Sequence, residues 1–331
     1  MKKILLEING LKTYFSRADG RDVKAVDSVS FKIREQETVC VVGESGCGKS
    51  MTALSIMGLV QKPRGRIAGG EILLDGTDLT KLSPEEMRHI RGNRISMIFQ
   101  EPMTSLNPVL TIGEQVNESI MIHGRLGKAE AMERVKEMLK TVGIARIDEI
   151  VNEYPHQLSG GMRQRVMIAM ALICEPSLLI ADEPTSALDV TIQAQLMDLI
   201  RELKAKVKMA VLFITHDLGV VADMADTVVV MYAGQAVEIA KADDLFDRPS
   251  HPYTRALMDS IPFIDRETET LFSIEGTVPD AAFYPDGCRF AARCFYYDKN
   301  ICPCADTVAL KEVGRGHSVR CIRAEGENQA G

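Results

Sequence analysis

The sequence predicts an α/β fold with a largely parallel sheet. Four apolar runs of strand length recur between turn residues: Thr38 to Val42, Leu178 to Ala181, Ala210 to Thr215 and Thr227 to Met231. Patterns of helical period lie between these runs, and strands that alternate with helices indicate parallel pairing. A glycine-rich loop directly after the first run indicates that this fold binds phosphate groups.

A second, antiparallel sheet is expected near the N-terminus. Shorter strands are predicted within residues 4–33 and from Gly70 to Asp75. The turn dipeptides Asp19-Gly20 and Asp75-Gly76 separate them, as is typical of strands joined by tight turns.

The stretch from Pro102 to Gln157 has a helical character that no strand-like run interrupts. Its segment 128–142 places five apolar side chains on one helical stripe, and we interpret its methionines as core fillers. The stripe consists of Met132, Val135, Met138, Leu139 and Val142. We therefore predict a helical subdomain at about residues 102–165.

The composition changes again after about residue 240, where prolines and cysteines become frequent. We predict a domain of residues 1–240 and a C-terminal extension of residues 241–331. A chain of 331 residues with 46% hydrophobic residues can form such a principal domain and a smaller one.

Charge and hydropathy exclude several classes of protein. The formal net charge of -7 gives no positive field for a nucleic-acid backbone. No window approaches the roughly 18 uninterrupted apolar residues of a membrane span. Glu7 and Asn9 interrupt the apolar start before a signal-peptide core forms. We expect a cytosolic protein that does not bind nucleic acid.

The loop after the first apolar run has the motif of a phosphate-binding loop. Residues 43–50 read GESGCGKS and fit G-x-x-x-x-G-K-[ST]. The motif lies between a predicted strand and a predicted helix, which argues against a glycine-rich turn that contains a lysine by chance. Glycines let backbone N–H groups point inward at phosphates, and the helix start adds its positive end. Lys49 is expected to reach the β- and γ-phosphates, and Ser50 to bind Mg²⁺. The predicted nucleotide contacts are Gly43, Glu44, Ser45, Gly46, Cys47, Gly48, Lys49, Ser50 and Met51.

An acidic pair ends the second apolar run. We expect Asp182 to hold the Mg²⁺ shell and Glu183 to polarise the attacking water. Acidic residues commonly end strands, so this pair predicts a phosphoryl-transfer site only together with Lys49.

Residues 158–165, LSGGMRQR, resemble the LSGGQ signature of ABC ATPases. Met162 replaces the usual glutamine and leaves Ser159, Gly160 and Gly161 intact. A serine hydroxyl and glycine N–H groups at a helix start form a second anion site. The resemblance implies the ABC cassette fold, a P-loop core with an antiparallel β subdomain and an inserted helical subdomain. It also implies that this site closes on ATP bound by a second ATPase subunit, head to tail.

Other landmarks of the family follow in the expected order. Gln100 is similar to the Q-loop glutamine that senses Mg²⁺ and water, and residues 186–189 resemble the D-loop of the dimer interface. His216 is similar to the switch histidine that contacts the γ-phosphate. The resemblance also implies an aromatic residue stacked on adenine, which is Phe15 or, as the alternative, Tyr14.

Two other kinds of ABC ATPase are disfavoured. Members that act in DNA repair, chromosome organisation or translation carry coiled-coil inserts, zinc modules or tandem cassettes, whereas this chain has one compact acidic cassette. A regulatory subunit without turnover would not need Glu183 and His216. Every residue that catalysis requires is present, so we expect this subunit to contribute functional residues to both of the ATP sites that form between two paired subunits.

Three further segments are similar to the oligopeptide/dipeptide (and nickel) importer ATPases: 99–108 (FQEPMTSLNP), 187–195 (ALDVTIQAQ) and 251–254 (HPYT). That resemblance implies a peripheral subunit at the cytoplasmic face of the inner membrane. Its implied partners are two permease subunits, a second ATPase subunit and, indirectly, an extracytoplasmic solute-binding protein. Dipeptides, oligopeptides, nickel and other small solutes remain open, as does whether the second ATPase is identical.

Five of the eight cysteines crowd the tail, and clustered cysteines in a cytosolic protein indicate metal more than disulfides. Cys288, Cys294, Cys302 and Cys321 are similar to the set that holds a 4Fe-4S cluster in the importer family, and Cys304 competes with Cys302 as third ligand. Zinc is one alternative, because cysteine spacing alone does not distinguish a zinc site from an iron–sulfur cluster. Reduced thiols that pack a small domain are the other alternative.

Overall fold

The computed structural model describes residues 2–100, 106–124, 126–185, 190–260, 274–302 and 307–324. It contains two compact units, each described by itself below. The first consists of Met1–Leu5, Arg34–Glu37 and Lys81–Phe213, and the second of Leu6–Ile33, Thr38–Thr80 and Ile214–Gly331.

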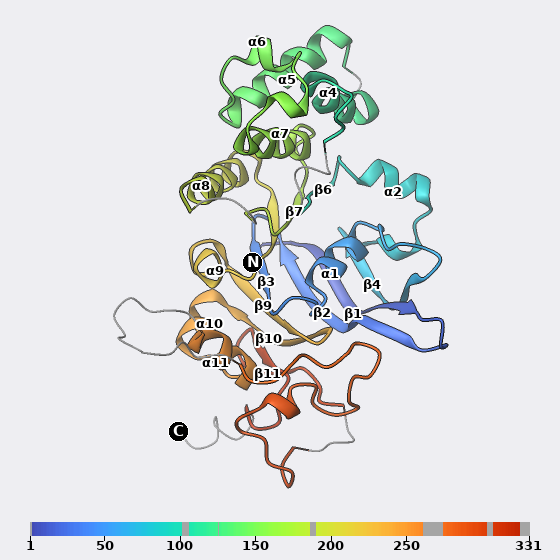
Figure 1. Cartoon of the computed structure of the whole chain (residues 1–331), viewed down its shortest axis with the longest axis vertical. Coiled ribbons are helices and arrows are strands. Elements are labelled where there is room, and N and C mark those ends of the chain that lie inside the picture. Colours follow the sequence, from blue (N-terminus) through green and yellow to red (C-terminus); the bar gives the residue numbers. More distant parts are fainter. Residues whose placement is uncertain are drawn as a thin grey trace. The chain divides into compact units, whose positions relative to one another are not determined.

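The second unit carries a sheet of four strands in the order β2-β1-β4-β5. β1 pairs with β4 and β4 pairs with β5, both antiparallel (Figure 1). The strands are β1 (Ile4–Ser16), β2 (Asp22–Arg34), β4 (Gly65–Leu74) and β5 (Thr77–Asp78). This confirms the predicted N-terminal antiparallel strands.

The strand predicted from Gly70 to Asp75 is longer in the structure, where β4 begins at Gly65. The register of β1 against β4 shifts between Asn9 and Lys12, as at a β-bulge. Gly70 has a φ of +82°, and a Cβ there would lie 2.4 Å from the carbonyl oxygen of Gly10. Glycine normally weakens a strand, but the bulge requires a glycine at this position.

The second unit also holds five strands in the order β11-β12-β10-β9-β3. β3 and β9 are parallel, and the other neighbours are antiparallel. The strands are β3 (Thr38–Val42), β9 (Thr227–Tyr232), β10 (Gln235–Lys241), β11 (Lys311–Gly314) and β12 (His317–Val319). The two short strands of the tail were not predicted from the sequence.

The helices of the second unit are short. They are α1 (Lys49–Ile56), α9 (Leu218–Met224), α10 (Ala242–Asp247) and α11 (Pro252–Asp259), with 3₁₀ turns η1 (Leu79–Lys81) and η3 (Ala291–Arg293). His251 begins α11, because its side chain accepts a hydrogen bond from the N–H of Tyr253.

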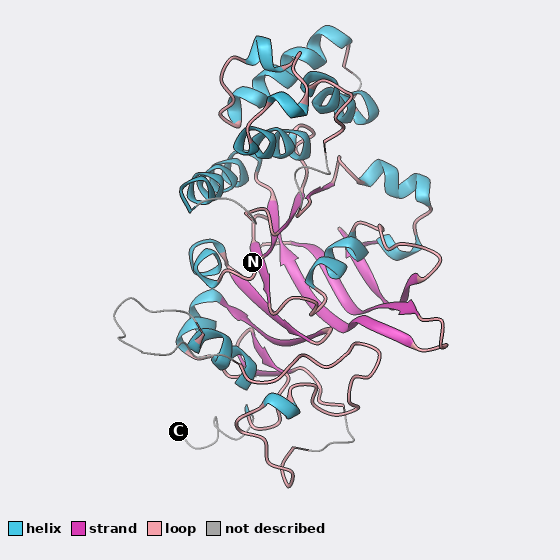
Figure 2. Ribbon diagram, viewed as in Figure 1, coloured by secondary structure: helices cyan, strands magenta, loops and turns pink. Residues whose placement is uncertain are grey.

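In the first unit the strands are β6 (Ile95–Ile98), β7 (Leu178–Asp182) and β8 (Ala210–Ile214), and β6 runs parallel to β7. Every residue of β7 and β8 is buried, which explains their continuous apolar sequences. The parallel pairs β6–β7 and β3–β9 confirm the predicted α/β class (Figure 2).

Helices fill the described part of the chain between β6 and β7 (Figure 1). They are α4 (Ile112–His123), α5 (Lys128–Thr141), α6 (Ile147–Ile150), η2 (Pro155–Gln157) and α7 (Gly160–Leu172), while α2 (Pro84–Ile90) precedes β6 and α8 (Val190–Val207) follows β7. α5 buries Val135, Met138 and Leu139, which confirms the predicted stripe, although Met132 is only half-buried. The predicted domain boundaries at residues 102, 165 and 240 stay predictions.

Across the described residues, no helix has the length and apolar character that crossing a membrane requires.

Candidate functional site

The predicted phosphate loop lies in the second unit, between β3 and α1. Gly43 and Gly48 have φ values of 148° and 103°, which disfavour any residue with a side chain. A Cβ at Gly43 would lie 2.1 Å from the carbonyl oxygen of Met231, and one at Gly48 would lie 2.3 Å from that of Ala25. Both glycines are therefore required by close backbone contacts as well as by conformation.

The loop curls around the ammonium group of Lys49. That side chain is only 5% exposed, and its Nζ donates hydrogen bonds to the carbonyl oxygens of Gly43 (2.7 Å) and Glu44 (3.2 Å). Ser45 and Gly46, at the tip of the loop, are exposed. A buried cation, a helix start and an exposed glycine-rich backbone together form a site suited to an anion.

The two aromatic candidates for adenine stacking have different environments at the end of β1. Phe15 pairs with Gly65 across the sheet, and a Cβ at Gly65 would lie 2.7 Å from the Phe15 ring. Tyr14 instead donates a hydrogen bond from its hydroxyl to Asp27 at 2.6 Å. Burial and this hydrogen bond raise the pKa of Tyr14, so its hydroxyl keeps its proton.

His216 follows β8 in the second unit, and its side chain is exposed. The next residue, Asp217, begins α9 by accepting hydrogen bonds from the N–H groups of Gly219 (2.8 Å) and Val220 (3.3 Å). This cap fixes the turn that presents the histidine.

The acidic pair and the glutamine lie together in the first unit. Asp182 ends β7 with only 4% of its surface exposed, and Glu183 follows with a φ of 45°. Gln100, beyond the end of β6, donates from Nε2 to Glu183 Oε2 at 3.1 Å. The parallel pairing of β6 with β7 brings these two residues to the same edge of the sheet.

The signature residues begin helix α7, also in the first unit. Ser159 is the N-cap, and its Oγ accepts a hydrogen bond from the N–H of Met162 at 3.4 Å. A Cβ at Gly160 would meet nothing within 4 Å, so the backbone at the helix start is open. Gln164, one turn further on, donates to the carbonyl oxygen of Pro184, which links this helix to the segment after Glu183.

Some predicted features lie outside the described residues. They are the D-loop at 186–189, residues 101–105 of the importer segment that begins at Phe99, and the alternative ligand Cys304.

The prediction of an iron–sulfur cluster is wrong. In the part of the chain that the structure describes, no group of three or more His, Cys, Asp or Glu side chains could hold a metal ion, which overturns zinc as well. The four thiols instead line a small cavity of about 30 Å³ whose surface is apolar. Burial raises the pKa of Cys288 to about 11 and also raises those of Cys294 and Cys321.

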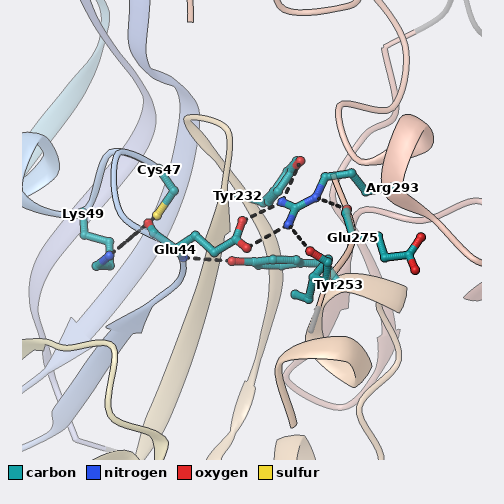
Figure 3. A network of polar contacts seen from close by, with 8 residues as sticks. Glu44, Cys47, Lys49, Tyr232, Tyr253, Glu275 and Arg293 are labelled. Carbon is teal, nitrogen blue, oxygen red and sulfur yellow. Dashed lines mark hydrogen bonds and ion pairs between the residues drawn. The ribbon is translucent and has the colours of Figure 1, made fainter. Parts of the chain in front are cut away.

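Two residues that the sequence analysis did not assign to the site contact the phosphate loop. Tyr253 of α11 and Arg293 of η3 both bind Glu44, one through its backbone and one through its side chain (Figure 3). Tyr253 belongs to a segment that indicated the family, but nothing in the sequence around Arg293 connects it with a loop 249 positions away.

Comparisons with known proteins agree with this arrangement. A family model described as "ABC transporter" matches residues 26–186, and one described as "Oligopeptide/dipeptide transporter, C-terminal region" matches residues 237–302. Among solved structures, the ATP-binding cassette MJ0796, a dimer bound to ADP and Pi, is 30% identical with a TM-score of 0.64. It aligns over 72% of this chain and 99% of its own.

Curated relatives match over a greater length. The oligopeptide transport ATP-binding protein AppD of Bacillus subtilis is 55% identical over 98% of both chains. The dipeptide transport ATP-binding protein DppD of the same organism is 52% identical over 89% of this chain and 87% of its own. The chain therefore belongs to the ATP-binding subunits of the oligopeptide/dipeptide ABC transporters, and it is an ATPase.

Proposed function

We propose that this subunit hydrolyses ATP to drive the import of dipeptides or oligopeptides through a membrane permease. The observation that carries the choice of solute is the 55% identity to the oligopeptide transport protein AppD over 98% of both chains. The match of residues 237–302 to the C-terminal region of oligopeptide/dipeptide transporters supports the same choice.

The nucleotide is proposed to bind residues 43–51, with Lys49 at the β- and γ-phosphates and Phe15 at the adenine. Ser50, Gln100 and Asp182 offer hydroxyl, amide and carboxylate oxygens, the ligands that Mg²⁺ prefers. When bound, Mg²⁺ neutralises charge on the phosphate oxygens.

Glu183 is proposed to orient and deprotonate the attacking water. Its hydrogen bond from Gln100, 3.1 Å long, supports this role because it fixes the direction of the carboxylate. His216 is proposed to contact the γ-phosphate from an exposed turn.

A second ATPase subunit is proposed to complete the site. Ser159, Gly160 and Gly161 offer one hydroxyl and open backbone N–H groups at the start of α7, which suits an anion that another polypeptide presents. The dimeric state of the MJ0796 cassette supports pairing with a homologous or identical chain, and this pairing is proposed to be head to tail.

The remaining partners follow from the family. The subunit is proposed to bind two integral-membrane permease subunits at the cytoplasmic face of the inner membrane, and to depend indirectly on an extracytoplasmic solute-binding protein. Binding of ATP joins two cassettes and reorients the permease, and hydrolysis separates them again.

The first test uses Glu183→Gln in the assembled transporter. We expect this variant to bind ATP as the parent does and to lose turnover by about two orders of magnitude or more, the usual contribution of a general base. Hydrolysis at nearly the parental rate would refute the role of Glu183.

The second test identifies the solute. The assembled transporter is reconstituted in vesicles, and uptake of labelled dipeptides, longer peptides and nickel is compared in parallel. Glu183→Gln is the matched control, because it separates ATP-driven uptake from leakage. Uptake of nickel without uptake of either class of peptide would refute the proposed solute.

A further inference from the structure

A bidentate ion pair joins the C-terminal extension to the phosphate loop (Figure 3). Arg293 Nη1 lies 2.7 Å from Glu44 Oε2, and Nη2 lies 3.0 Å from Glu44 Oε1. The side chain of Arg293 is 5% exposed and that of Glu44 is 27% exposed. A fork of two parallel hydrogen bonds fixes direction as well as distance, so the pair holds Glu44 in one orientation.

Arg293 is itself fixed by the backbone of the extension. Its Nε donates to the carbonyl oxygen of Glu275 at 3.0 Å, and Nη2 donates to that of Ile274 at 3.1 Å. The hydrogen bonds to Glu44 raise the pKa of Arg293 above its ordinary value. The guanidinium is therefore a charged and oriented group before any nucleotide binds.

Tyr253 holds the same loop residue by its backbone. The N–H of Glu44 donates to the Tyr253 hydroxyl at 2.9 Å. The ring packs against those of Tyr232 and Phe290, with centroid distances of 4.7 and 5.4 Å, so the hydroxyl has a fixed position. Burial raises the pKa of Tyr253, so it is a neutral phenol.

Glu44 matters to the loop in two ways. Its carbonyl oxygen accepts one of the hydrogen bonds that Lys49 Nζ makes to the loop, so its backbone helps to place the cation. Its carboxylate lies on the loop that receives a triphosphate, where an unpaired negative charge would repel the ligand.

We propose that Arg293 and Tyr253 are positioning residues for nucleotide binding. Arg293 neutralises Glu44 and turns its carboxylate toward the extension, while Tyr253 anchors the Glu44 backbone that supports Lys49. The extension thus sets the affinity of the phosphate loop for ATP. This inference rests on the proposed assignment of residues 43–51 as the nucleotide site.

The test measures the dissociation constant of the full-length chain for a fluorescent ATP analogue with Mg²⁺. Arg293→Gln leaves the carboxylate unpaired, and we expect Kd to rise at least about fivefold, the lower end of ordinary coupling between sites. The double variant Glu44→Gln/Arg293→Gln also removes the carboxylate and is expected to recover most of that loss. A purely structural role of Arg293 predicts no such recovery.

The matched control is Arg320→Gln. Arg320 is also a buried arginine of the extension, and it donates to the carbonyl oxygens of Ala236 (2.8 Å) and Val308 (2.7 Å). Its loss is expected to lower the thermal midpoint while Kd stays within about twofold of the parent. A rise in Kd equal to that of Arg293→Gln would overturn the proposal, because general loosening of the tail would then explain both.

Two further variants separate the possible failures. Lys49→Ala is expected to abolish binding, and if it binds as the parent does, the nucleotide assignment itself is wrong. If Lys49→Ala loses binding while Arg293→Gln and the parent have the same Kd, only the positioning role is wrong.

Should Arg293→Gln fail to fold, Tyr253→Phe tests the proposal instead, because it removes one hydroxyl and keeps the ring. We expect its Kd to rise between about twofold and tenfold, the range of one neutral hydrogen bond, and an unchanged Kd overturns the proposal.

Discussion

Mild acid is expected to destabilise the second unit through His251. This side chain is 1% exposed, and its Nδ1 accepts the hydrogen bond from the Tyr253 N–H that begins α11. Burial lowers the pKa of His251 from 6.5 to about 4, although the nearby Glu238 and a hydrogen bond to the backbone of Arg320 act in the opposite direction. The charged Arg320 adds to the lowering.

The size of the effect follows from linkage. The pKa of His251 is lower in the folded chain than in the unfolded chain, so protons bind the unfolded chain first as the pH falls. Its contribution to stability is complete above pH 6.5 and is lost as the pH falls toward 4. At pH 5, which is 1.5 units below 6.5, the loss is about 2 kcal/mol at about 1.4 kcal/mol per unit.

Urea denaturation at pH 7.5 and pH 5 measures this loss. Far-UV circular dichroism is the suitable signal, because the chain has no tryptophan. His251→Asn can still begin the helix but does not titrate, so it corrects for every other group that binds protons in this interval. The reasoning is refuted if the parent and His251→Asn lose the same free energy of unfolding between the two pH values.

Three more substitutions have outcomes that the structure predicts. Gly43→Ala is expected to lower the free energy of unfolding by about 2 to 5 kcal/mol, because it combines a strained φ with a clash, whereas Gly127→Ala, with no atom within 4 Å of the new Cβ, should change it little. Chemical denaturation measures both, and equal effects would contradict the clash. Phe15→Ala is expected to raise the Kd for ATP by roughly fivefold to a hundredfold if its ring stacks on adenine, while Tyr14→Ala should leave Kd within about twofold of the parent. The opposite pattern would favour Tyr14. Glu238→Gln is expected to lower stability by about 1 to 3 kcal/mol at pH 7.5, because the fully buried carboxylate accepts hydrogen bonds from the N–H groups of Ser250 and His251. An unchanged urea midpoint would show that the amide satisfies both donors.

The local parts of the site could be predicted from the sequence. The loop at 43–50 needs glycines at fixed positions and a lysine at the helix start, so its conformation could be predicted from consecutive residues. The acidic pair of Asp182 and Glu183 ends a buried strand, which is a local pattern, but it indicated a phosphoryl-transfer site only together with Lys49.

Contacts between distant residues could not be predicted in this way. Arg293 and Glu44 are 249 positions apart, and the sequence around an arginine in a 3₁₀ turn has no pattern that indicates its partner. The metal site was predicted wrongly for a related reason: spacing shows that cysteines recur, but not whether their thiols are placed so that three or more could bind one metal ion. The bulge at Gly70 also depends on a partner strand, since its need for glycine comes from the backbone of Gly10.

The pairing of β12 with β10 also matters while the chain is being made. Val319 and Ser318 form their ladder with Glu238 and Ile239 only near the end of the sequence. Until β12 has emerged from the ribosome, one edge of β10 has an open row of unpaired N–H and C=O groups with which a neighbouring polypeptide can pair. A chain trimmed after residue 260 would lack β12, would carry that open row permanently and would be prone to self-association.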